Sequence, residues 1–229
     1  MKKNKLKHIC FILDGNKRWA KKNNLNQLDG YKKGIEKIYE IIKYCYEHNI
    51  EYVTLYLLST ENVNRKNNNS FFKLANKSFE GFVKKINKIG KIKMNIIGEN
   101  KNLPKNILNL IKEFPLKQKN DFNQTINLAF NYGFIDELKS VIKKTNEFAL
   151  ENKMHVDEVN IENFFYLKNQ PDPDILIRTG GYNRISNFIL KNLIYTELYF
   201  LETLWPDLKL SQIQNIILKY NKINRKYEL

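Results

Sequence analysis

The chain has 229 residues, a length that one α/β domain can reach by itself. Hydrophobic residues make up 42% of it and aromatic residues 13%, which is enough for a large core and excludes a disordered chain, a collagen-like fibre and a small disulfide-stapled domain. The formal net charge of +15 favours an anionic partner: a phosphate-bearing molecule, a nucleic acid or an anionic membrane surface. Many of the lysines are scattered among asparagines, however, so a compositional bias explains the charge equally well.

The two cysteines, Cys10 and Cys45, lie in apolar segments without the Cys-x-x-Cys spacing of redox or metal motifs. They are therefore expected to be buried thiols in a reducing compartment. The basic start of the chain leads into an apolar run that ends at Asp14 without a cleavage site of small residues, so no secretory signal is expected. No stretch approaches the roughly 20 apolar residues of a membrane-spanning helix. We expect a cytoplasmic protein that is able to contact a membrane peripherally.

Short apolar runs alternate with helical patterns along the whole chain, which predicts an α/β fold with a central, mostly parallel sheet flanked by helices. We expect one domain over residues 1–229, because no linker separates two parts. Strands are predicted at residues 9–13, 52–58, 92–97, 125–130, 175–177 and 198–200. Helices are predicted around the apolar stripes at 35–45 and 72–86, and at 106–117, 135–150 and 211–222.

Four of these strands end in polar or glycine-containing turns, at residues 14–18, 59–62, 131–133 and 178–181. In an open parallel sheet the carboxyl ends of the strands share one edge, and ligands bind in the crevice along it. The four turns are therefore predicted to converge on one site.

The first of these turns combines a carboxylate with features that attract phosphate. Gly15 lets a backbone approach closely, and the free N–H groups of the helix that follows attract an anion. Asp14 would repel that anion unless a cation such as Mg²⁺ lies between them. Alternatively, Asp14 is only the N-cap of the helix, a common use of Asp. The residues alone leave these two interpretations open.

The turn after the fifth strand offers a receptor of diphosphate size. Arg178, Arg184 and Ser186 flank a Gly pair and supply forked donors, a hydroxyl and open backbone amides. Glu197 follows and could supply a second carboxylate for a metal. The bland alternative is a surface turn with solvated arginines.

With these two turns in view, the chain resembles the cis-prenyltransferases, the undecaprenyl diphosphate synthase family. The resemblance rests on residues 8–20, 59–62, 127–133, 174–188, 195–200 and 204–207, which match that family's motifs in the same order. It implies an enzyme that condenses isopentenyl diphosphate onto an allylic diphosphate, typically farnesyl diphosphate. Each new double bond is cis, and the product is a polyprenyl diphosphate such as undecaprenyl diphosphate. The resemblance also implies Mg²⁺ as cofactor and a homodimer, for which the apolar segment 188–204 is a candidate interface.

The resemblance also assigns roles to residues. Asp14 and Glu197 would be the carboxylates near Mg²⁺, and Asn62 stands at the position associated with proton removal. Because an amide is a poor base, we expect Asn62 to orient a water or a diphosphate oxygen. The allylic diphosphate is expected on Gly15, Asn16, Lys17, Arg18 and Trp19, isopentenyl diphosphate on Arg178, Arg184, Ile185 and Ser186, and further substrate contacts from Ser59, Thr60, Glu61 and Arg65.

An apolar cavity is also needed for the growing chain. Its candidate lining consists of Phe71, Phe72, Leu74, Phe79, Phe82, Val83 and Ile86, for most of which core packing is the simpler use. Several positions depart from the family pattern, namely Gln27, Tyr31, Val63, Tyr182, Asn183 and Glu228. These departures bear on substrate affinity, rate and product length.

Two other functions compete with a catalytic prenyltransferase. A non-catalytic subunit of a two-component prenyltransferase would be expected to lack the Asp14 turn, which this chain has. A basic nucleic-acid-binding protein would be expected to concentrate Lys and Arg on one face, whereas here Lys is spread over nearly every segment. We therefore expect no nucleic-acid partner. In the family the chain ends reach the neighbouring subunit, so Arg225 and Lys226 are expected to act there.

Overall fold

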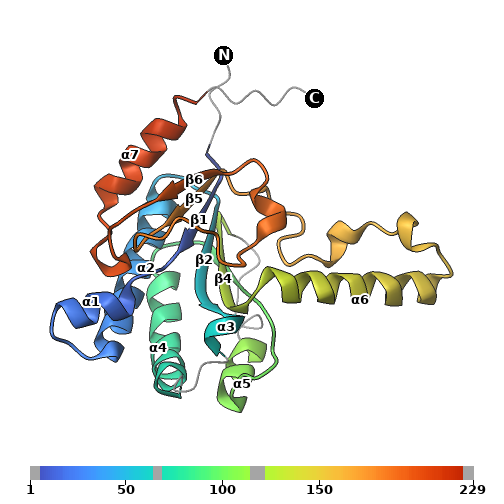
Figure 1. Ribbon diagram of the computed structural model, residues 1–229, viewed down its shortest axis with the longest axis horizontal. Coiled ribbons are helices and arrows are strands. Elements are labelled where there is room, and N and C mark those ends of the chain that lie inside the picture. Colours follow the sequence, from blue (N-terminus) through green and yellow to red (C-terminus); the bar gives the residue numbers. More distant parts are fainter. Residues whose placement is uncertain (1–5, 64–68, 114–121, 224–229) are drawn as a thin grey trace.

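The computed structural model describes residues 6–63, 69–113 and 122–223 and contains one sheet of six strands (Figure 1). The strand order is β3-β4-β2-β1-β5-β6, and every neighbouring pair is parallel. The strands are β1 (His8–Ile12), β2 (Tyr52–Ser59), β3 (Ile92–Ile97), β4 (Gln124–Tyr132), β5 (Ile175–Arg178) and β6 (Glu197–Phe200). The expectation of a mostly parallel sheet is confirmed, and the described sheet is parallel throughout.

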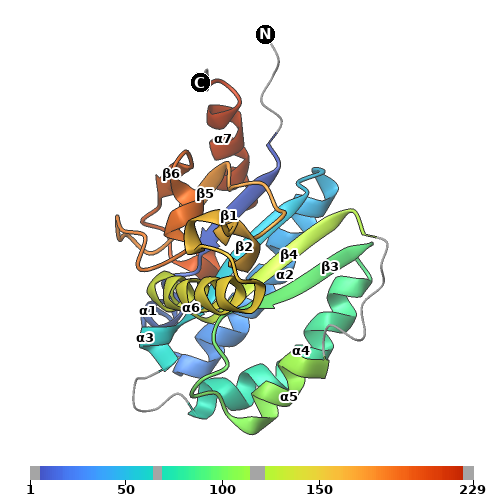
Figure 2. The same ribbon diagram turned by 90° about the vertical axis from the view of Figure 1, so that its right-hand side faces the viewer.

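Helices connect the strands and cover the sheet. They are α1 (Asn16–Lys22), α2 (Gln27–Glu47), α3 (Thr60–Val63), α4 (Asn69–Asn87), α5 (Lys105–Glu113), α6 (Phe134–Asn152) and α7 (Leu210–Tyr220). Short 3-10 helices lie at Val156–Glu158, Ile161–Phe164, Leu190–Leu193 and Trp205–Asp207. Much of α6, with the segment that follows it, projects from the body as an arm (Figures 1 and 2).

Strand β1 shows why the sheet is central. All five of its residues are buried, so both of its faces are covered. Ile9 and Phe11 belong to the cluster formed with α2 and α7, whereas Cys10 and Ile12 belong to the cluster on the opposite face with Phe188. Side chains alternate between the two faces of a strand, and a strand covered on both faces reads as a continuous apolar run. That run is what made β1 recognisable in the sequence.

The predicted strands all form, and their bounds differ from the expected ones by two residues or fewer. The helix expected at 106–117 forms α5, which ends at Glu113; residues 114–117 lie outside the described residues. The cysteines are free and buried, as expected. Among the described residues, no helix has the length and apolar character that crossing a membrane requires.

Candidate active site

A polar cleft opens at the carboxyl edge of the sheet, where β1, β2 and β5 end side by side. Its volume is about 670 Å³. Three of the four predicted turns contribute to its lining, those that follow β1, β2 and β5. The turn at residues 131–133, after β4, is not among the lining residues, so the predicted convergence is observed for three turns only. The predicted site residues that line it are Asp14, Gly15, Asn16, Lys17, Arg18, Ser59, Glu61, Asn62, Arg178, Arg184 and Ser186.

The carboxylate of Asp14 joins the first turn to the turn after β5. Its Oδ1 accepts a hydrogen bond from Arg18 Nη2 at 3.1 Å, and its Oδ2 accepts one from Arg178 Nη2 at 2.9 Å. The N-cap of α1 is Gly15, with φ +118°, and no side chain caps the helix. The capping interpretation of Asp14 is therefore wrong: its carboxylate binds the guanidinium groups of Arg18, in α1, and Arg178, at the end of β5.

Arg178 is an almost completely buried cation, with only 4% of its side chain exposed. Its Nη1 donates to the carbonyl oxygen of Arg184 at 2.5 Å and to Ser186 Oγ at 2.7 Å. Its buried Nε has no hydrogen-bond partner among the described residues. A buried charge is costly unless it is paired and fully hydrogen-bonded. Arg178 therefore keeps one buried donor that its described neighbours leave unsatisfied.

Arg184 and Ser186 complete the predicted anion receptor. Arg184 is exposed, and its Nε donates to Ser186 Oγ at 3.2 Å. Ser186 has a positive φ of 55°, a conformation that costs energy for a residue other than glycine. The Tyr56 hydroxyl lies near this backbone, where its one proton is shared between the carbonyl oxygens of Tyr132 at 3.1 Å and Ser186 at 3.3 Å. Burial raises the pKa of Tyr56, so that hydroxyl stays protonated and remains a donor.

The turn after β2 supplies the opposite wall of the cleft. Ser59 Oγ accepts the backbone N–H of Asn62 at 3.2 Å, which starts the short helix α3. Glu61 Oε1 accepts from Asn187 Nδ2 at 2.9 Å, and Asn187 Oδ1 in turn accepts the backbone N–H of Ile135 at 3.0 Å. Asn187 thus ties the β2 turn, the Arg184 loop and the start of α6 to one another.

Three predicted substrate residues do not line the cleft. Trp19 Nε1 donates to Asp207 Oδ1 at 2.7 Å, so its indole fixes α1 against the 3-10 helix at Trp205–Asp207. Thr60 packs against Gly133. Ile185 packs on the hydrophobic cluster around Phe188. The expected roles of Arg65, Arg225, Lys226 and Glu228 fall outside the described residues.

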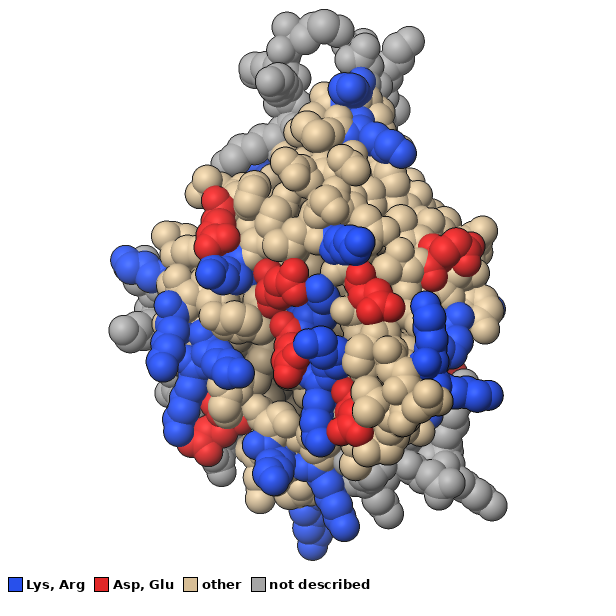
Figure 3. Space-filling model, turned by 90° about the vertical axis from the view of Figure 1, so that its left-hand side faces the viewer, with Lys and Arg blue, Asp and Glu red and all other residues tan. Residues whose placement is uncertain are grey.

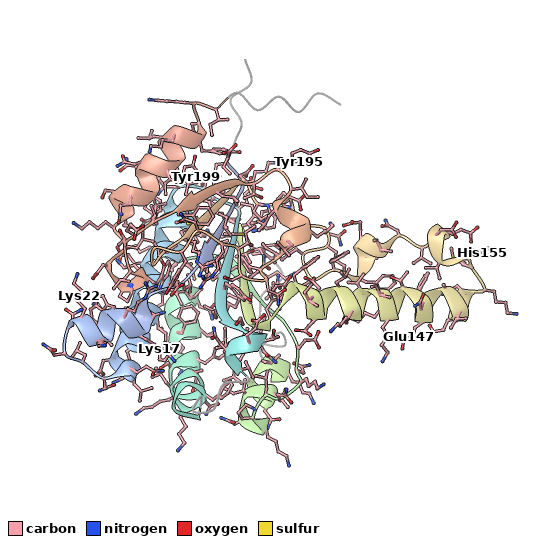
Figure 4. The ribbon with its side chains drawn as sticks, in the orientation of Figure 1. Lys17, Lys22, Glu147, His155, Tyr195 and Tyr199 are labelled. Atoms are coloured by element: carbon pink, nitrogen blue, oxygen red, sulfur yellow. The ribbon has the colours of Figure 1, made fainter. Side chains whose placement is uncertain are left out.

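Glu197 lies at the wrong end of the sheet to share an ion with Asp14 of the same chain. It is the first residue of β6 and pairs with Ile175, the first residue of β5, whereas Arg178 pairs with Ile12 and Phe200 at the carboxyl ends. Three residues of strand correspond to a distance of about 10 Å. Figure 4 shows Tyr195, two residues before Glu197, far from Lys17 on α1. Asp14 and Glu197, the two predicted metal carboxylates, are therefore not brought together within one chain.

The Asp14 carboxylate by itself fits the way in which proteins hold a magnesium ion beside phosphate groups. Among the described residues, no group of three or more His, Cys, Asp or Glu side chains could hold a metal. Mg²⁺ does not need such a cage, because it commonly binds one or two carboxylates together with phosphate oxygens and waters. The Asp14 side chain is 28% exposed and lines the cleft, and each of its oxygens contacts one arginine. A carboxylate has about four acceptor sites, which leaves capacity for a cation.

An apolar cavity of about 140 Å³ lies against the polar cleft. The two share four lining residues, Leu13, Asn16, Tyr31 and Leu57. Three residues from the predicted lining, Leu74, Phe79 and Phe82, are present, and α2 and α5 contribute others. Phe72, Val83 and Ile86 instead pack in the core, and the Phe71 side chain is not among those the structure describes.

Three of the positions that depart from the family pattern, Gln27, Tyr31 and Tyr182, lie at or beside the site. Gln27 Nε2 donates to Tyr31 Oη at 3.2 Å within α2, and Tyr31 lines both the cleft and the cavity. Val63 belongs to a small core cluster, and Asn183 is exposed. The sequence analysis did not assign Tyr56, Tyr182 and Asn187 to the site, although all three line the cleft. The Tyr182 departure was the available signal for one of them.

This combination, a parallel sheet whose carboxyl edge carries an arginine-rich cleft beside an apolar cavity, fits a protein that binds a diphosphate with a hydrocarbon tail. Residues 12–228 match the family model described as "Putative undecaprenyl diphosphate synthase". The chain belongs to this family of cis-prenyltransferases. The resemblance seen in the sequence is thereby confirmed.

Named relatives carry several specificities. An isoprenyl transferase of Aquifex aeolicus is 36% identical over 96% of this chain and 94% of its own length. An undecaprenyl-diphosphate synthase of Pasteurella multocida, named as farnesyl-diphosphate specific, is 34% identical (96% and 93% coverage), and one of Pyrococcus horikoshii, named as geranylgeranyl-diphosphate specific, is 33% identical (96% and 86%). The fold matches lavandulyl diphosphate synthase of Lavandula x intermedia, solved with dimethylallyl diphosphate, with TM-score 0.88, 24% identity and coverage of 95% and 96%.

Proposed function

We propose that this chain condenses isopentenyl diphosphate onto farnesyl diphosphate and forms a polyprenyl diphosphate such as undecaprenyl diphosphate. The observation that carries the proposal is the junction of the two cavities. A cleft with Arg18, Arg178 and Arg184 opens directly onto a cavity lined mainly by apolar side chains. An allylic diphosphate has the same division into a doubly charged head and a hydrocarbon tail.

The two diphosphates are assigned to opposite sides of Asp14. In this proposal the allylic diphosphate lies over Gly15 and contacts Lys17 and Arg18. Isopentenyl diphosphate binds Arg178, Arg184 and Ser186, whose donors already converge. Because α1 has only seven residues, we assign the binding of the allylic diphosphate to the side chains of Lys17 and Arg18 more than to the N-terminal end of the helix. Arginine forks match phosphate oxygens in pairs, which fixes orientation as well as charge.

The proposed reaction breaks the allylic C1–O bond and joins that carbon to C4 of isopentenyl diphosphate. Diphosphate departs with the electron pair of the broken bond, and a proton leaves C2 of the isopentenyl unit as the new double bond forms. Arg18 and Lys17 stabilise the negative charge that grows on the departing diphosphate, and they do so more strongly in the transition state than before it. Magnesium, held by Asp14 together with the diphosphate, would add positive charge to the leaving group.

Asn62 is proposed to guide the removal of the proton. It lines the cleft on the β2 side, where the Ser59 hydroxyl holds its backbone. An amide is not basic enough to take the proton itself. It can orient a water or an oxygen of the departing diphosphate, which is a stronger base once it carries the released charge.

The growing chain is proposed to enter the apolar cavity, and the lipid product is proposed to leave at a membrane surface. We therefore place the enzyme in the cytoplasm, with peripheral contact at the membrane through its product. The free buried thiols of Cys10 and Cys45 are consistent with a reducing compartment.

A homodimer is also proposed, on the basis of apolar side chains around the edge strand β6. Leu190, Ile194, Tyr195 and Leu198 are all exposed there. Exposed apolar clusters and open strand edges are surfaces that soluble proteins generally cover. Glu197 lies in the same patch, so in such a dimer it faces the second copy and not its own Asp14. Light scattering at micromolar concentration should give twice the chain mass, and Ile194→Lys should shift it to the single-chain value.

The alternatives are less well supported. A non-catalytic subunit would not need the Asp14 contacts with Arg18 and Arg178, which this chain has. A nucleic-acid-binding protein would need a continuous basic track. In Figure 3, acidic side chains are interspersed among the basic ones over the visible face.

The test is incubation of the purified chain with Mg²⁺, radiolabelled isopentenyl diphosphate and, separately, geranyl, farnesyl and geranylgeranyl diphosphate, followed by chromatography of the products. The proposal expects chain extension with farnesyl diphosphate as the best starter, and loss of the product when the ion is chelated. Efficient extension of geranylgeranyl diphosphate alone would contradict the choice of starter. No incorporation with any starter would contradict the function.

A further inference from the structure

The ring of Tyr182 lies among three guanidinium groups. The guanidinium carbons are 4.2 Å from the ring centroid for Arg184, 4.9 Å for Arg18 and 5.6 Å for Arg178. All three distances are within the roughly 6 Å at which the face of an aromatic ring attracts a cation. The ring also lines the cleft and is 42% exposed. One neutral side chain therefore contacts every arginine assigned to the two diphosphates.

Three cations at this spacing repel one another, and the nearby carboxylate neutralises only part of that charge. Asp14 pairs with Arg18 and Arg178. Among the described residues Arg184 forms no ion pair, and it is the arginine nearest the ring. The electron-rich face of Tyr182 therefore supplies the attraction that Arg184 lacks from any acidic group.

The backbone at Gly180, two residues before Tyr182, leaves room for Arg18. Gly180 has φ +90°, and a Cβ built there would lie 2.5 Å from Arg18 Nη2. A side chain at position 180 would displace the guanidinium. Glycine at this position thus lets an arginine from the β1 side reach a ring on the β5 side. The hydroxyl of Tyr182 makes no hydrogen bond within the described part of the chain, so the interaction belongs to the ring.

We propose that Tyr182 is a positioning residue whose aromatic face holds Arg18 and Arg184 toward the cleft, so that both diphosphate subsites are organised before substrate binds. The proposal deepens the proposed function and rests on it. Because the side chain contacts arginines from both subsites, its loss should weaken the binding of both substrates and not of one alone.

The first test compares Tyr182→Leu, which removes the ring, with Tyr182→Phe, which keeps it. Calorimetry with inorganic pyrophosphate should show an increase in Kd on the order of tenfold for Tyr182→Leu and less than twofold for Tyr182→Phe. In steady-state assays, KM for both diphosphate substrates should rise for Tyr182→Leu, while kcat changes by less than about threefold. The matched control is Phe122→Leu, because Phe122 is a similarly exposed ring with Lys93 Nζ 5.1 Å from its centroid, before β4 and away from the cleft. This control should behave like the wild type.

A second test separates ring electronics from ring shape. Phenylalanine at position 182 is replaced by its mono-, di- and trifluorinated forms, which keep the size while withdrawing electron density from the face of the ring. The proposal expects the pyrophosphate Kd to rise with each added fluorine, which a purely steric role would not produce.

The outcomes distinguish this proposal from the function on which it rests. An active wild type whose Tyr182→Leu variant matches it in Kd and KM overturns the role of Tyr182 alone. Equal losses in the Leu and Phe variants, or no trend across the fluorinated series, also overturn it. A wild type that neither binds pyrophosphate nor extends any starter overturns both.

Discussion

The polar side chains at the two ends of strand β1 differ in burial and in how completely their hydrogen-bonding groups are paired. At its start, His8 is completely buried, and its two ring nitrogens meet the carbonyl oxygen of Pro171 at 2.7 Å and Thr54 Oγ1 at 2.8 Å. Beyond its end, Asp14 is partly exposed and faces two arginines, one of which retains a buried donor with no described partner. One end is complete by itself and supports the fold. The other end has hydrogen-bonding and charge capacity left for a ligand.

The largest effect is expected from Asp14→Asn, which removes the carboxylate beyond the carboxyl end of β1. The substitution removes the negative charge that joins Arg18 and Arg178, and turnover should fall by about 100-fold or more. Because Asp14 also pairs with the buried Arg178, the free energy of unfolding should fall by about 1–2 kcal/mol. Assays of turnover at increasing Mg²⁺ concentration measure the loss of activity. Urea unfolding without substrate measures the change in the free energy of unfolding. Retention of more than about a tenth of wild-type turnover would contradict the metal-linked role.

The next effect distinguishes the two arginines of the receptor. Arg178→Ala should reduce kcat/KM for isopentenyl diphosphate by tens to more than a hundredfold, because a buried charged donor is lost. Arg184→Ala should cost less, about tenfold, since this side chain is exposed and water can replace part of its contact. Steady-state kinetics of both variants test the order. A larger loss for Arg184 would show that burial does not set the contribution.

A smaller effect on rate, with a clear effect on product length, is expected at the apolar cavity that adjoins the polar cleft. Ala75 lines this cavity, and Ala75→Phe would fill part of its 140 Å³. The products should become shorter by at least one isoprene unit, while the first condensation proceeds at nearly the wild-type rate. Asn76→Phe, at an exposed position on the same helix, is the control and should leave product length unchanged. Unshortened products from Ala75→Phe would exclude this cavity as the path of the chain.

The smallest effect on turnover is expected at His8, the first residue of β1, where pH affects the free energy of unfolding. Burial lowers the pKa of His8 from 6.5 to about 4. Below pH 6.5 the unfolded chain therefore binds a proton that the folded chain does not, so the unfolding free energy falls as pH drops. The contribution approaches about 3 kcal/mol near pH 4. Urea unfolding at pH 7 and pH 4 should show this additional loss in the wild type relative to His8→Gln.

Direct titration of the His8 imidazole by NMR gives an independent check of the same prediction. A midpoint near pH 6.5 in the folded protein would contradict it, whatever the stability of the variant. Activity at neutral pH should be insensitive to the protonation of His8, because the imidazole is already neutral there.

Local patterns determined the sheet, its parallel strands and the place of the cleft. The apolar runs of β1 and β5 are typical of strands covered on both faces, and parallel strands bring their carboxyl ends to one edge. Asp14, Arg178 and Ser186 were predicted together for this reason. The role of Asp14, after the end of β1, could not be predicted in the same way. An aspartate that caps a helix and an aspartate that lines a cleft have the same local sequence.

The tertiary structure decided which long-range partner each side chain meets. It directed Asp14 to Arg178, 164 residues away, and the Trp19 indole to Asp207, 188 residues away. It placed Glu197 at the amino ends of the strands, opposite the carboxyl ends where Asp14 lies. The register of β6 against β5 depends on pairing that no local pattern encodes. The tertiary structure also gathered three arginines around Tyr182. The type of an element follows from the periodicity of its own residues, whereas contacts between elements depend on register, loop path and packing, which only the folded chain defines.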